Sequence, residues 1–333
     1  MKKKIAVVFT GGTISMKVDE RLSAAIPALS SEEIMSMVTN IDRFAEIEIV
    51  EFGKYPGPHM TPERILRLSF LTKALIERDD IDGVVITHGT DSLEETAYFL
   101  DLNIKPGKPI VMVAAMRNSS ELGYDGPSNL SSAICTAISN DSFHKGVLIV
   151  MNNEVNAARE TTKSHTLSLD TFKSLEFGPL GIVDNDRVIF YRNILSHEHI
   201  ETELIEDKVA LIKTHVGIDS DYINYCIDQD YKGFVIEAMG RGNIPQEMVA
   251  GVKRAITADL PVVIVSRCAM GRVLYTYGYE GGGKHLRQLG AIFGGNLNGQ
   301  KARVKLMLLL GSMATMKEIK IAFEQNDYDF ESV

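Results

Sequence analysis

Short runs of apolar and β-branched residues alternate along the chain with longer helix-like segments. In the first half, strands are predicted at residues 5–9, 47–52, 83–87, 109–113 and 146–151. Helices are predicted between them, at residues 31–38, 61–77, 92–100 and 127–139. The third helix begins with Ser92-Leu93-Glu94-Glu95, which has the spacing of a capping box. Strands that alternate with helices in this way are typical of parallel sheets with crossover helices.

The pattern becomes polar and irregular between about residues 184 and 205, and a second series of strands and helices follows. Its predicted strands are residues 209–214, 233–237 and 261–266, and its predicted helices lie near 246–257 and 301–310. We therefore expect two α/β domains, residues 1–190 and 208–333, joined by a linker at 191–207. The larger N-terminal domain should have a parallel-type sheet, with the catalytic groups at its strand ends.

Composition and charge exclude several classes of protein. The chain has 333 residues, of which 45% are apolar and 24% are charged, and its net charge is −9. A nucleic-acid-binding face needs clustered Lys and Arg side chains, and the sequence offers only Lys2-Lys3-Lys4. No apolar run approaches the roughly 20 residues of a membrane helix. We therefore expect binding to neither nucleic acid nor membranes.

Two features bear on the cellular compartment. The apolar run at residues 5–9 is shorter than the roughly 7–15 residues of a signal peptide's apolar region. The three cysteines, Cys135, Cys226 and Cys268, are odd in number and far apart, which fits neither a disulfide framework nor a zinc site. Both features favour a cytoplasmic protein.

The segment Thr10-Gly11-Gly12-Thr13-Ile14-Ser15 follows the first predicted strand. Ligands of open parallel sheets bind at the carboxyl ends of strands, and paired glycines allow a turn that exposes backbone N–H groups. A hydroxyl held beside such a turn could attack a carbonyl group. The segment lacks the endings of phosphate loops and dinucleotide fingerprints, but a glycine turn is equally often structural.

A second segment, Thr87-His88-Gly89-Thr90-Asp91-Ser92, also follows a strand and begins a helix. Helix N-termini favour anions such as a substrate carboxylate, although Asp91 and Ser92 also suit a purely structural cap. A third segment, residues 158–164, contains Lys163, which is either solvated or paired. A lysine held by Asp91 beside a threonine hydroxyl would form a proton relay, and a threonine needs such activation to act as a nucleophile.

These segments resemble the signatures of the asparaginase/glutaminase family. Thr-Gly-Gly-Thr-Ile at 10–14 and Thr-His-Gly-Thr-Asp at 87–91 are the two main matches. The resemblance continues in the same order at residues 94–100, 115–117, 125–127, 163, 171–174, 177–181 and 300–304. On these segments the chain is identified as a member of the family.

The resemblance implies a reaction and the residues that perform it. L-Asparagine would be hydrolysed to L-aspartate and ammonia through an acyl-threonine intermediate, without a metal or organic cofactor. Thr13 would be the nucleophile, and Lys163 would tune Thr90 and the attacking water. Asp91 would complete this group and bind the α-amino group of the substrate. The backbone near Thr90 and Ala115 would hold the amide oxygen as its negative charge develops.

The resemblance also implies shared active sites. In the family, the C-terminal domain of a partner subunit completes each site, and Asn243 matches a residue that approaches the substrate amine. We therefore expect a homodimer or a homotetramer, the latter being usual in the family.

Two positions depart from the family pattern. A mobile loop after the first signature normally supplies a tyrosine that contacts the nucleophile, and Ala24 stands there in this chain. A serine normally binds the substrate carboxylate just before the position of Met60, and Gly57 takes its place. Both departures leave the reaction class intact but bear on substrate identity and rate.

Three alternatives stay open. The same chemistry could act on glutamine, a D-amino acid amide or a small peptide amide. The protein could also be a weakly catalytic amino-acid-binding module, although binding alone does not need two hydroxyls and a lysine. The amidotransferase subunit that acts on charged tRNA is also similar, but it carries an extra N-terminal domain, whereas this chain starts at its first strand.

Overall fold

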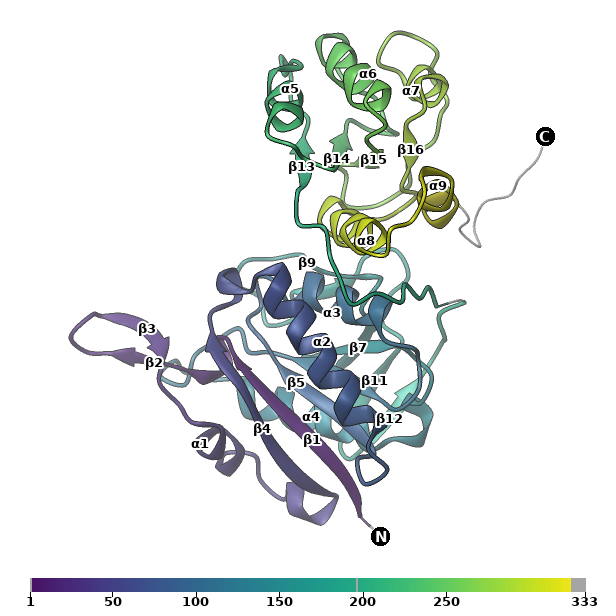
Figure 1. The fold of residues 1–333 in the computed structure, drawn as a ribbon. Coiled ribbons are helices and arrows are strands. Elements are labelled where there is room, and N and C mark those ends of the chain that lie inside the picture. Colours follow the sequence, from purple (N-terminus) through teal and green to yellow (C-terminus); the bar gives the residue numbers. More distant parts are fainter. Residues whose placement is uncertain (1, 196, 325–333) are drawn as a thin grey trace. The chain divides into compact units, whose positions relative to one another are not determined.

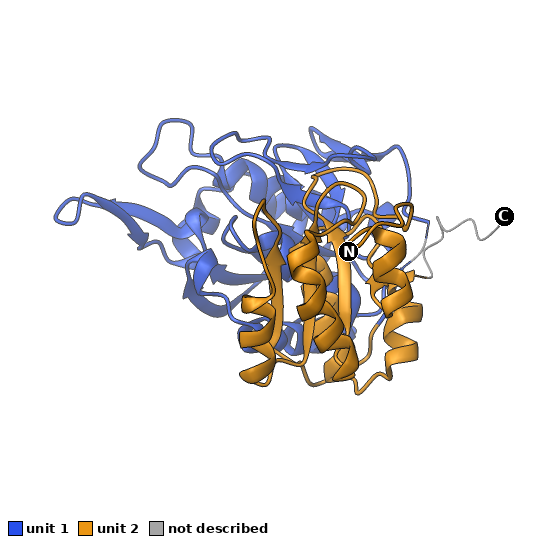
Figure 2. Cartoon of the chain, turned by 90° about the horizontal axis from the view of Figure 1, so that it is seen from above, with its two compact units in different colours: residues 1–199 blue, residues 200–333 orange. Residues whose placement is uncertain are grey.

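The computed structural model describes residues 2–195 and 197–324, which belong to two compact units, Met1–His199 and Ile200–Val333. Figure 2 colours the two units separately. The division falls within the predicted linker, and the described part of residues 191–208 contains neither helix nor strand. The exact domain limits stay a prediction, and residues 325–333 of the predicted C-terminal domain lie outside the described residues.

Unit 1 is built on an eight-stranded mixed sheet with the strand order β12-β11-β8-β7-β6-β5-β1-β4. From β4 to β7 neighbouring strands are parallel, and from β7 to β12 they are antiparallel. The expected parallel sheet is therefore correct only for the strands from β4 to β7. The bounds are β1 Lys3–Gly11, β4 Ala45–Tyr55, β5 Gly83–Thr87, β6 Ile110–Val113, β7 Val147–Met151, β8 Glu154–Ala157, β11 Gly181–Asp184 and β12 Arg187–Phe190.

Helices cover both faces of this sheet. In Figure 1, α2 lies in front of the sheet and α4 lies behind it. Every residue of β5 and β6 is therefore buried, which explains why these strands are continuous apolar runs in the sequence. The helix bounds are α1 Ser31–Ser36, α2 Pro62–Glu77, α3 Leu93–Asn103 and α4 Gly126–Ile138.

Smaller elements of unit 1 lie outside the main sheet. Strands β2 and β3 form a hairpin that projects from the body of unit 1 in Figure 1. This hairpin occupies the segment that was expected to be a mobile loop. Strands β9 and β10 form a second two-stranded ribbon. The bounds are β2 Met16–Asp19, β3 Ala24–Pro27, β9 Thr161–Lys163 and β10 Phe172–Ser174, with 3₁₀ turns η1 Thr13–Ser15, η2 Ile41–Arg43, η3 Gly57–His59 and η4 Asn140–Ser142.

Unit 2 has a four-stranded parallel sheet with the order β13-β14-β15-β16 and its own hydrophobic core. The three predicted strands and both predicted helices are present. The strands are β13 Val209–Lys213, β14 Gly233–Ala238, β15 Val262–Ser266 and β16 Ile292–Phe293. The helical elements are α5 Asp221–Asp228, η5 Gln246–Met248, α6 Val249–Thr257, α7 Gly283–Leu289, α8 Gly299–Gly311 and α9 Met316–Glu324.

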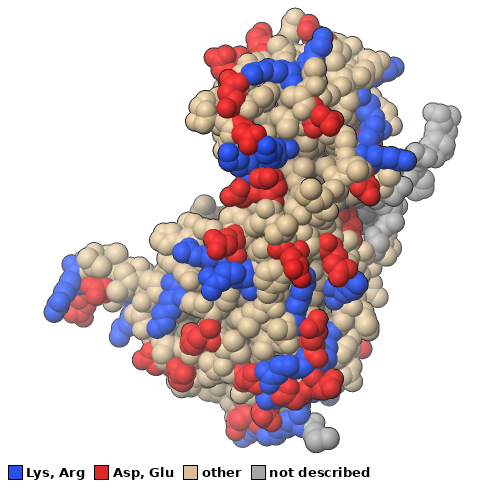
Figure 3. Space-filling model, viewed as in Figure 1, with Lys and Arg blue, Asp and Glu red and all other residues tan. Residues whose placement is uncertain are grey.

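Charged side chains of both signs lie on the surface. On the face drawn in Figure 3, acidic and basic side chains are interspersed over the surface of each unit. In the described part of the chain, the helices are too short or too polar to cross a membrane.

Candidate active site

Four loops of unit 1 follow the carboxyl ends of neighbouring parallel strands. Because parallel neighbours end at the same edge of a sheet, the topology brings these loops together, where ligands bind in open α/β sheets. The predicted site residues lie on them: Thr13 after β1, Gly57 after β4, Thr90 and Asp91 after β5, and Ala115 after β6.

Three glycines allow the loops after β1, β4 and β5 to pack backbone against backbone. A Cβ atom on Gly12 would lie 2.5 Å from the N atom of Gly89. A Cβ atom on Gly89 would lie 2.5 Å from the N and Cα atoms of Gly57. Gly12 also has a φ of +83°, which residues with a side chain rarely adopt. The two signature loops are therefore in direct contact, one residue before Thr13 and one before Thr90.

Thr13 begins the 3₁₀ turn η1 at the end of β1. The turn is held from within, because both the backbone N and the hydroxyl of Ser15 donate to the Gly12 carbonyl, at 3.0 and 2.8 Å. The Thr13 side chain is half-buried, and its hydroxyl has no hydrogen-bond partner within the described residues. A hydroxyl on a firmly held turn, without a partner among the described residues, is available to a substrate.

Thr90, Asp91 and Lys163 form one hydrogen-bonded group. The Lys163 Nζ donates to Thr90 Oγ1 at 2.9 Å and to Asp91 Oδ1 at 2.7 Å. Thr90 is only 7% exposed, whereas the Asp91 side chain is 61% exposed. An ammonium that donates to a hydroxyl oxygen stabilises negative charge there, so this geometry can move a proton between Thr90 and Lys163.

The backbone of Lys163 is fixed by a residue that the sequence analysis gave no role. Lys163 ends β9, and its backbone N donates to the Glu94 Oε2 at 3.0 Å. Glu94 is buried in the first turn of α3, directly after Asp91 and Ser92. The helix that follows the second signature therefore also holds the lysine that pairs with it. In the sequence, Glu94 stands out only as part of the capping-box segment 92–95 and of the matching segment 94–100.

Ser92 is the N-cap of α3, but the capping box is not formed. The Ser92 side chain accepts no capping hydrogen bond, and its hydroxyl donates instead to the Gly57 carbonyl at 2.6 Å. A hydroxyl oriented toward another loop is not placed to cap its own helix. Gly57 itself is buried, and a Cβ atom there would lie 3.3 Å from the carbonyl carbon of Gly89. Ser92 thus ties the predicted carboxylate-binding loop to α3.

The backbone of Ala115 is buried, and its N–H and C=O groups have no partner within the described residues. Its neighbours are firmly held. The Asn129 side chain donates to the Ala114 carbonyl at 3.0 Å, and the Met116 N donates to Asp125 Oδ2 at 3.0 Å. Buried backbone groups are rarely left without partners, so those of Ala115 are suited to bind a polar group of a substrate.

His88 belongs to the second signature segment and is fully buried. Its Nδ1 lies 2.9 Å from the Gly89 carbonyl oxygen, so Nδ1 carries the proton, and Nε2 is buried without a partner in the described residues. Burial lowers the pKa of His88 to about 4, against the smaller opposing effect of the Gly89 hydrogen bond. The imidazole is therefore neutral near pH 7 and plays a structural role.

Two further predicted positions are not on these four loops. Asn243 belongs to unit 2, after β14, where its amide oxygen accepts a hydrogen bond from the Gly283 N at 3.2 Å. Its approach to a substrate stays a prediction. Ala24, the position of the missing loop tyrosine, is exposed in β3 opposite Asp19.

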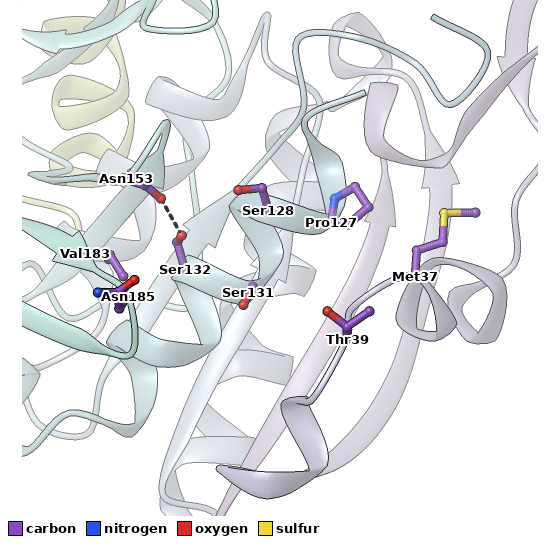
Figure 4. A pocket seen from close by; sticks show the side chains of 9 residues that line it. All are labelled: Met37, Thr39, Pro127, Ser128, Ser131, Ser132, Asn153, Val183 and Asn185. Carbon is purple, nitrogen blue, oxygen red and sulfur yellow. Dashed lines mark hydrogen bonds between the residues drawn. The ribbon is translucent and has the colours of Figure 1, made fainter. Parts of the chain in front are cut away.

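Unit 1 also has a cavity of about 370 Å³ that is unrelated to the predicted site (Figure 4). The hydroxyl of Ser132 donates to Asn153 Oδ1 at 2.8 Å in its wall. The residues described around it are Met37, Thr39, Pro127, Ser128, Ser131, Ser132, Asn153, Val183 and Asn185. No charged side chain is among them, so this cavity offers neither a base nor an activated nucleophile.

Comparison with known proteins identifies both halves of the chain. Residues 4–196 match the family model "Asparaginase, N-terminal", and residues 208–323 match "Glutaminase/Asparaginase C-terminal domain". An L-asparaginase of Bacillus licheniformis is 34% identical over 312 residues, covering 94% of this chain and 97% of that protein. The crystal structure of a probable cytoplasmic L-asparaginase from Campylobacter jejuni has a TM-score of 0.87 and 33% identity, covering 97% of this chain and 99% of that chain.

One component of a different enzyme is also similar. A glutamyl-tRNA(Gln) amidotransferase subunit of Pyrococcus abyssi is 31% identical, and the match covers 95% of this chain but 74% of that protein. The two family models together span both units, and the L-asparaginase of Bacillus licheniformis is matched over nearly its full length. These matches decide to which family the chain belongs. The chain belongs to the asparaginase family of hydrolases.

Proposed function

We propose that the protein hydrolyses the side-chain amide of L-asparagine to L-aspartate and ammonia, with Thr13 as the nucleophile. The observation that carries this proposal is the contact of the two signature loops. This contact lies one residue before Thr13, whose hydroxyl has no partner among the described residues, and one residue before Thr90, which Lys163 contacts at 2.9 Å. The asparaginase relatives support asparagine as the substrate.

In the first half-reaction, the Thr13 oxygen attacks the amide carbon of the substrate. The charge that develops on the amide oxygen is held by backbone groups near Thr90 and Ala115. The threonine proton passes to the leaving nitrogen, the C–N bond breaks, and ammonia leaves an ester on Thr13. In the second half-reaction, Thr90 and Lys163 orient a water molecule that attacks the ester carbon. The ester C–O bond breaks and the proton lost by the water passes to the Thr13 oxygen, which releases aspartate and restores the Thr13 hydroxyl.

Ammonia release from a panel of L- and D-amides tests both the reaction and the substrate. Wild-type protein should prefer L-asparagine over glutamine and the D-amides. Thr13→Ala should lower turnover at least about 1,000-fold, and mass spectrometry should find an aspartyl adduct on wild type but not on this variant. A rate for Thr13→Ala above about a tenth of wild type would exclude Thr13 as the nucleophile.

The proposal includes the assembly and the compartment. We propose a homodimer or homotetramer in which Asn243 of one subunit approaches the substrate in another. We also propose a cytoplasmic location, which is supported by three free cysteines.

A further inference from the structure

Ile14 directly follows Thr13. Among the described residues, Tyr124 is the one whose side chain hydrogen-bonds to the Ile14 carbonyl. Its hydroxyl donates to the Ile14 carbonyl at 2.5 Å, across 110 positions of sequence. Ile14 is fully buried in the centre of η1, so this bond acts on the turn that carries Thr13. The carbonyls on either side of Ile14 are held by backbone groups of the chain instead.

The packing around Tyr124 keeps its ring in place. A Cβ atom on Gly126 would lie 2.4 Å from the Tyr124 hydroxyl oxygen, so only a glycine leaves room for this ring position. Burial, and secondarily the charge of Asp125, raise the pKa of the Tyr124 hydroxyl, which therefore stays a donor at neutral and moderately alkaline pH.

The next residue holds the other side of the site. Asp125 Oδ1 accepts hydrogen bonds from the backbone N atoms of Met116 and Arg117, at 3.1 and 3.0 Å. These two amides directly follow Ala115. Two consecutive residues just before α4 thus hold two loops: Tyr124 holds the turn that carries Thr13, and Asp125 holds the segment that follows Ala115.

From this geometry, and resting on the proposed function, we propose that Tyr124 is a positioning residue that orients Thr13 through the Ile14 carbonyl. It sets the distance between the nucleophile and the backbone groups that hold the amide oxygen. It takes over part of the constraint that a loop tyrosine would exert, since Ala24 stands at that loop position. A displacement of about 1 Å in a reacting group can cost about 100-fold in rate.

Tyr124→Phe tests this assignment because it removes one donor and keeps the ring. We expect kcat to fall 10- to 100-fold with KM within twofold of wild type, since the hydroxyl donates to a carbonyl of the chain itself. Ser119→Ala is the matched control. It removes a 2.9 Å hydrogen bond from the Ser119 hydroxyl to the carbonyl of Met16, which lies two residues after Ile14. The backbone N of Ser119 keeps its own hydrogen bond to the same carbonyl.

Ser119→Ala should retain kcat within twofold, with a melting temperature close to that of Tyr124→Phe. Unchanged kcat in Tyr124→Phe, a change confined to KM, or equal losses of kcat in both variants would each overturn the assignment. Thr13→Ala in the same assay separates this result from the proposed function. If Thr13→Ala is inactive while Tyr124→Phe is fully active, only the role of Tyr124 fails; an active Thr13→Ala removes the proposed nucleophile itself.

Discussion

Gly89 packs its backbone directly on that of Gly57, so that a Cβ atom on Gly89 would lie 2.5 Å from both the N and Cα atoms of Gly57. Because the crowded atoms are backbone on both sides, neither loop can yield by rotating a side chain. The ends of β4 and β5 are thereby held at a fixed separation, with the predicted carboxylate-binding position on one and Thr90 on the other.

We therefore expect Gly89→Ala to abolish activity. It should also destabilise unit 1 by about 1–3 kcal/mol or more, because overpacking of a close contact usually has an effect of this size. Gly107→Ala is the control, because a Cβ atom there would meet nothing closer than the Lys105 carbonyl oxygen at 3.9 Å. Its effect should stay within about 0.5 kcal/mol. Urea denaturation of both variants measures the difference, and equal stabilities would contradict the tight contact.

Lys163→Met should reduce kcat about 100-fold or more while changing stability little. General acid–base groups contribute factors of about 10²–10⁴, whereas Asp91 is exposed enough that an unpaired carboxylate there costs about 1 kcal/mol or less. Lys173→Met is a matched control from the partner strand β10, since Lys173 is also partly buried and pairs with Glu154 at 2.8 Å. If both variants keep wild-type kinetics, Lys163 is a structural surface lysine.

The sequence predicted the parts of the fold whose signal is local. The strand at residues 83–87 has the same bounds in the structure because burial on both faces makes it a continuous apolar run. The antiparallel strands β8 and β12 were missed, although their turns carry a local signal. Asn152 and Asn153 have φ of 51° and 61°, and Asn185 has φ of 55°, in the two-residue turns that precede them. Asparagine favours such hairpin turns.

The supporting contacts of the site could not be predicted in this way. Glu94 reaches the Lys163 backbone across 69 positions, and Tyr124 reaches Ile14 across 110. Neither hydrophobic periodicity nor motif spacing encodes which distant loops a side chain will meet. The same limit explains Ser92, whose spacing predicts a cap but whose hydroxyl finds the Gly57 carbonyl 35 positions away.

His88 should make the stability of unit 1 depend on pH between about 4 and 6.5. Its pKa falls from 6.5 to about 4 on folding, so the unfolded chain binds a proton more readily than the folded one. The stability from the neutral imidazole is complete above pH 6.5 and is lost as the pH falls toward 4. From this residue alone, the free energy of unfolding should be about 2–3 kcal/mol lower at pH 4.5 than at pH 7.

Urea denaturation at pH 7 and pH 4.5 measures this effect, with His88→Gln as the comparison. The variant should lose less stability between the two pH values than wild type, whatever its absolute stability. NMR titration of the His88 ring gives an independent check. A ring that titrates near 6.5 in the folded protein would refute the prediction.

Shared active sites can be tested by complementation, in which two differently inactivated subunits are combined in one oligomer. Thr13→Ala and Asn243→Ala subunits should each form weakly active assemblies, but their co-expression should restore activity. In a mixed pair, one site would combine an intact unit 1 with an intact unit 2 from the partner. Co-expression of Thr13→Ala with Lys163→Met should restore nothing, because each site then keeps one defect. Light scattering should show a dimer or tetramer, and a fully active monomer would rule out shared sites.

Gly57→Ser should tighten the binding of L-asparagine. If position 57 is the carboxylate-binding position, as the family resemblance predicts, a serine hydroxyl there would supply a hydrogen bond to the substrate carboxylate that glycine cannot make. A hydrogen bond to a charged group is worth about 1.5–3 kcal/mol, so wild-type protein should bind asparagine weakly. The new side chain fits only closely, since its Cβ atom would lie 3.3 Å from the Gly89 carbonyl carbon and 3.4 Å from the Asp91 N atom.

Gly57→Ala separates this crowding from the effect of the hydroxyl, because it adds the Cβ atom alone. We expect KM to be about tenfold or more lower in Gly57→Ser than in Gly57→Ala, with closely similar kcat values. Substrates without an α-carboxylate, such as the corresponding primary amides, should show no such difference between the two variants. If the alanine and serine variants have the same KM for L-asparagine, the carboxylate does not bind at position 57, and the loops must hold it by another group.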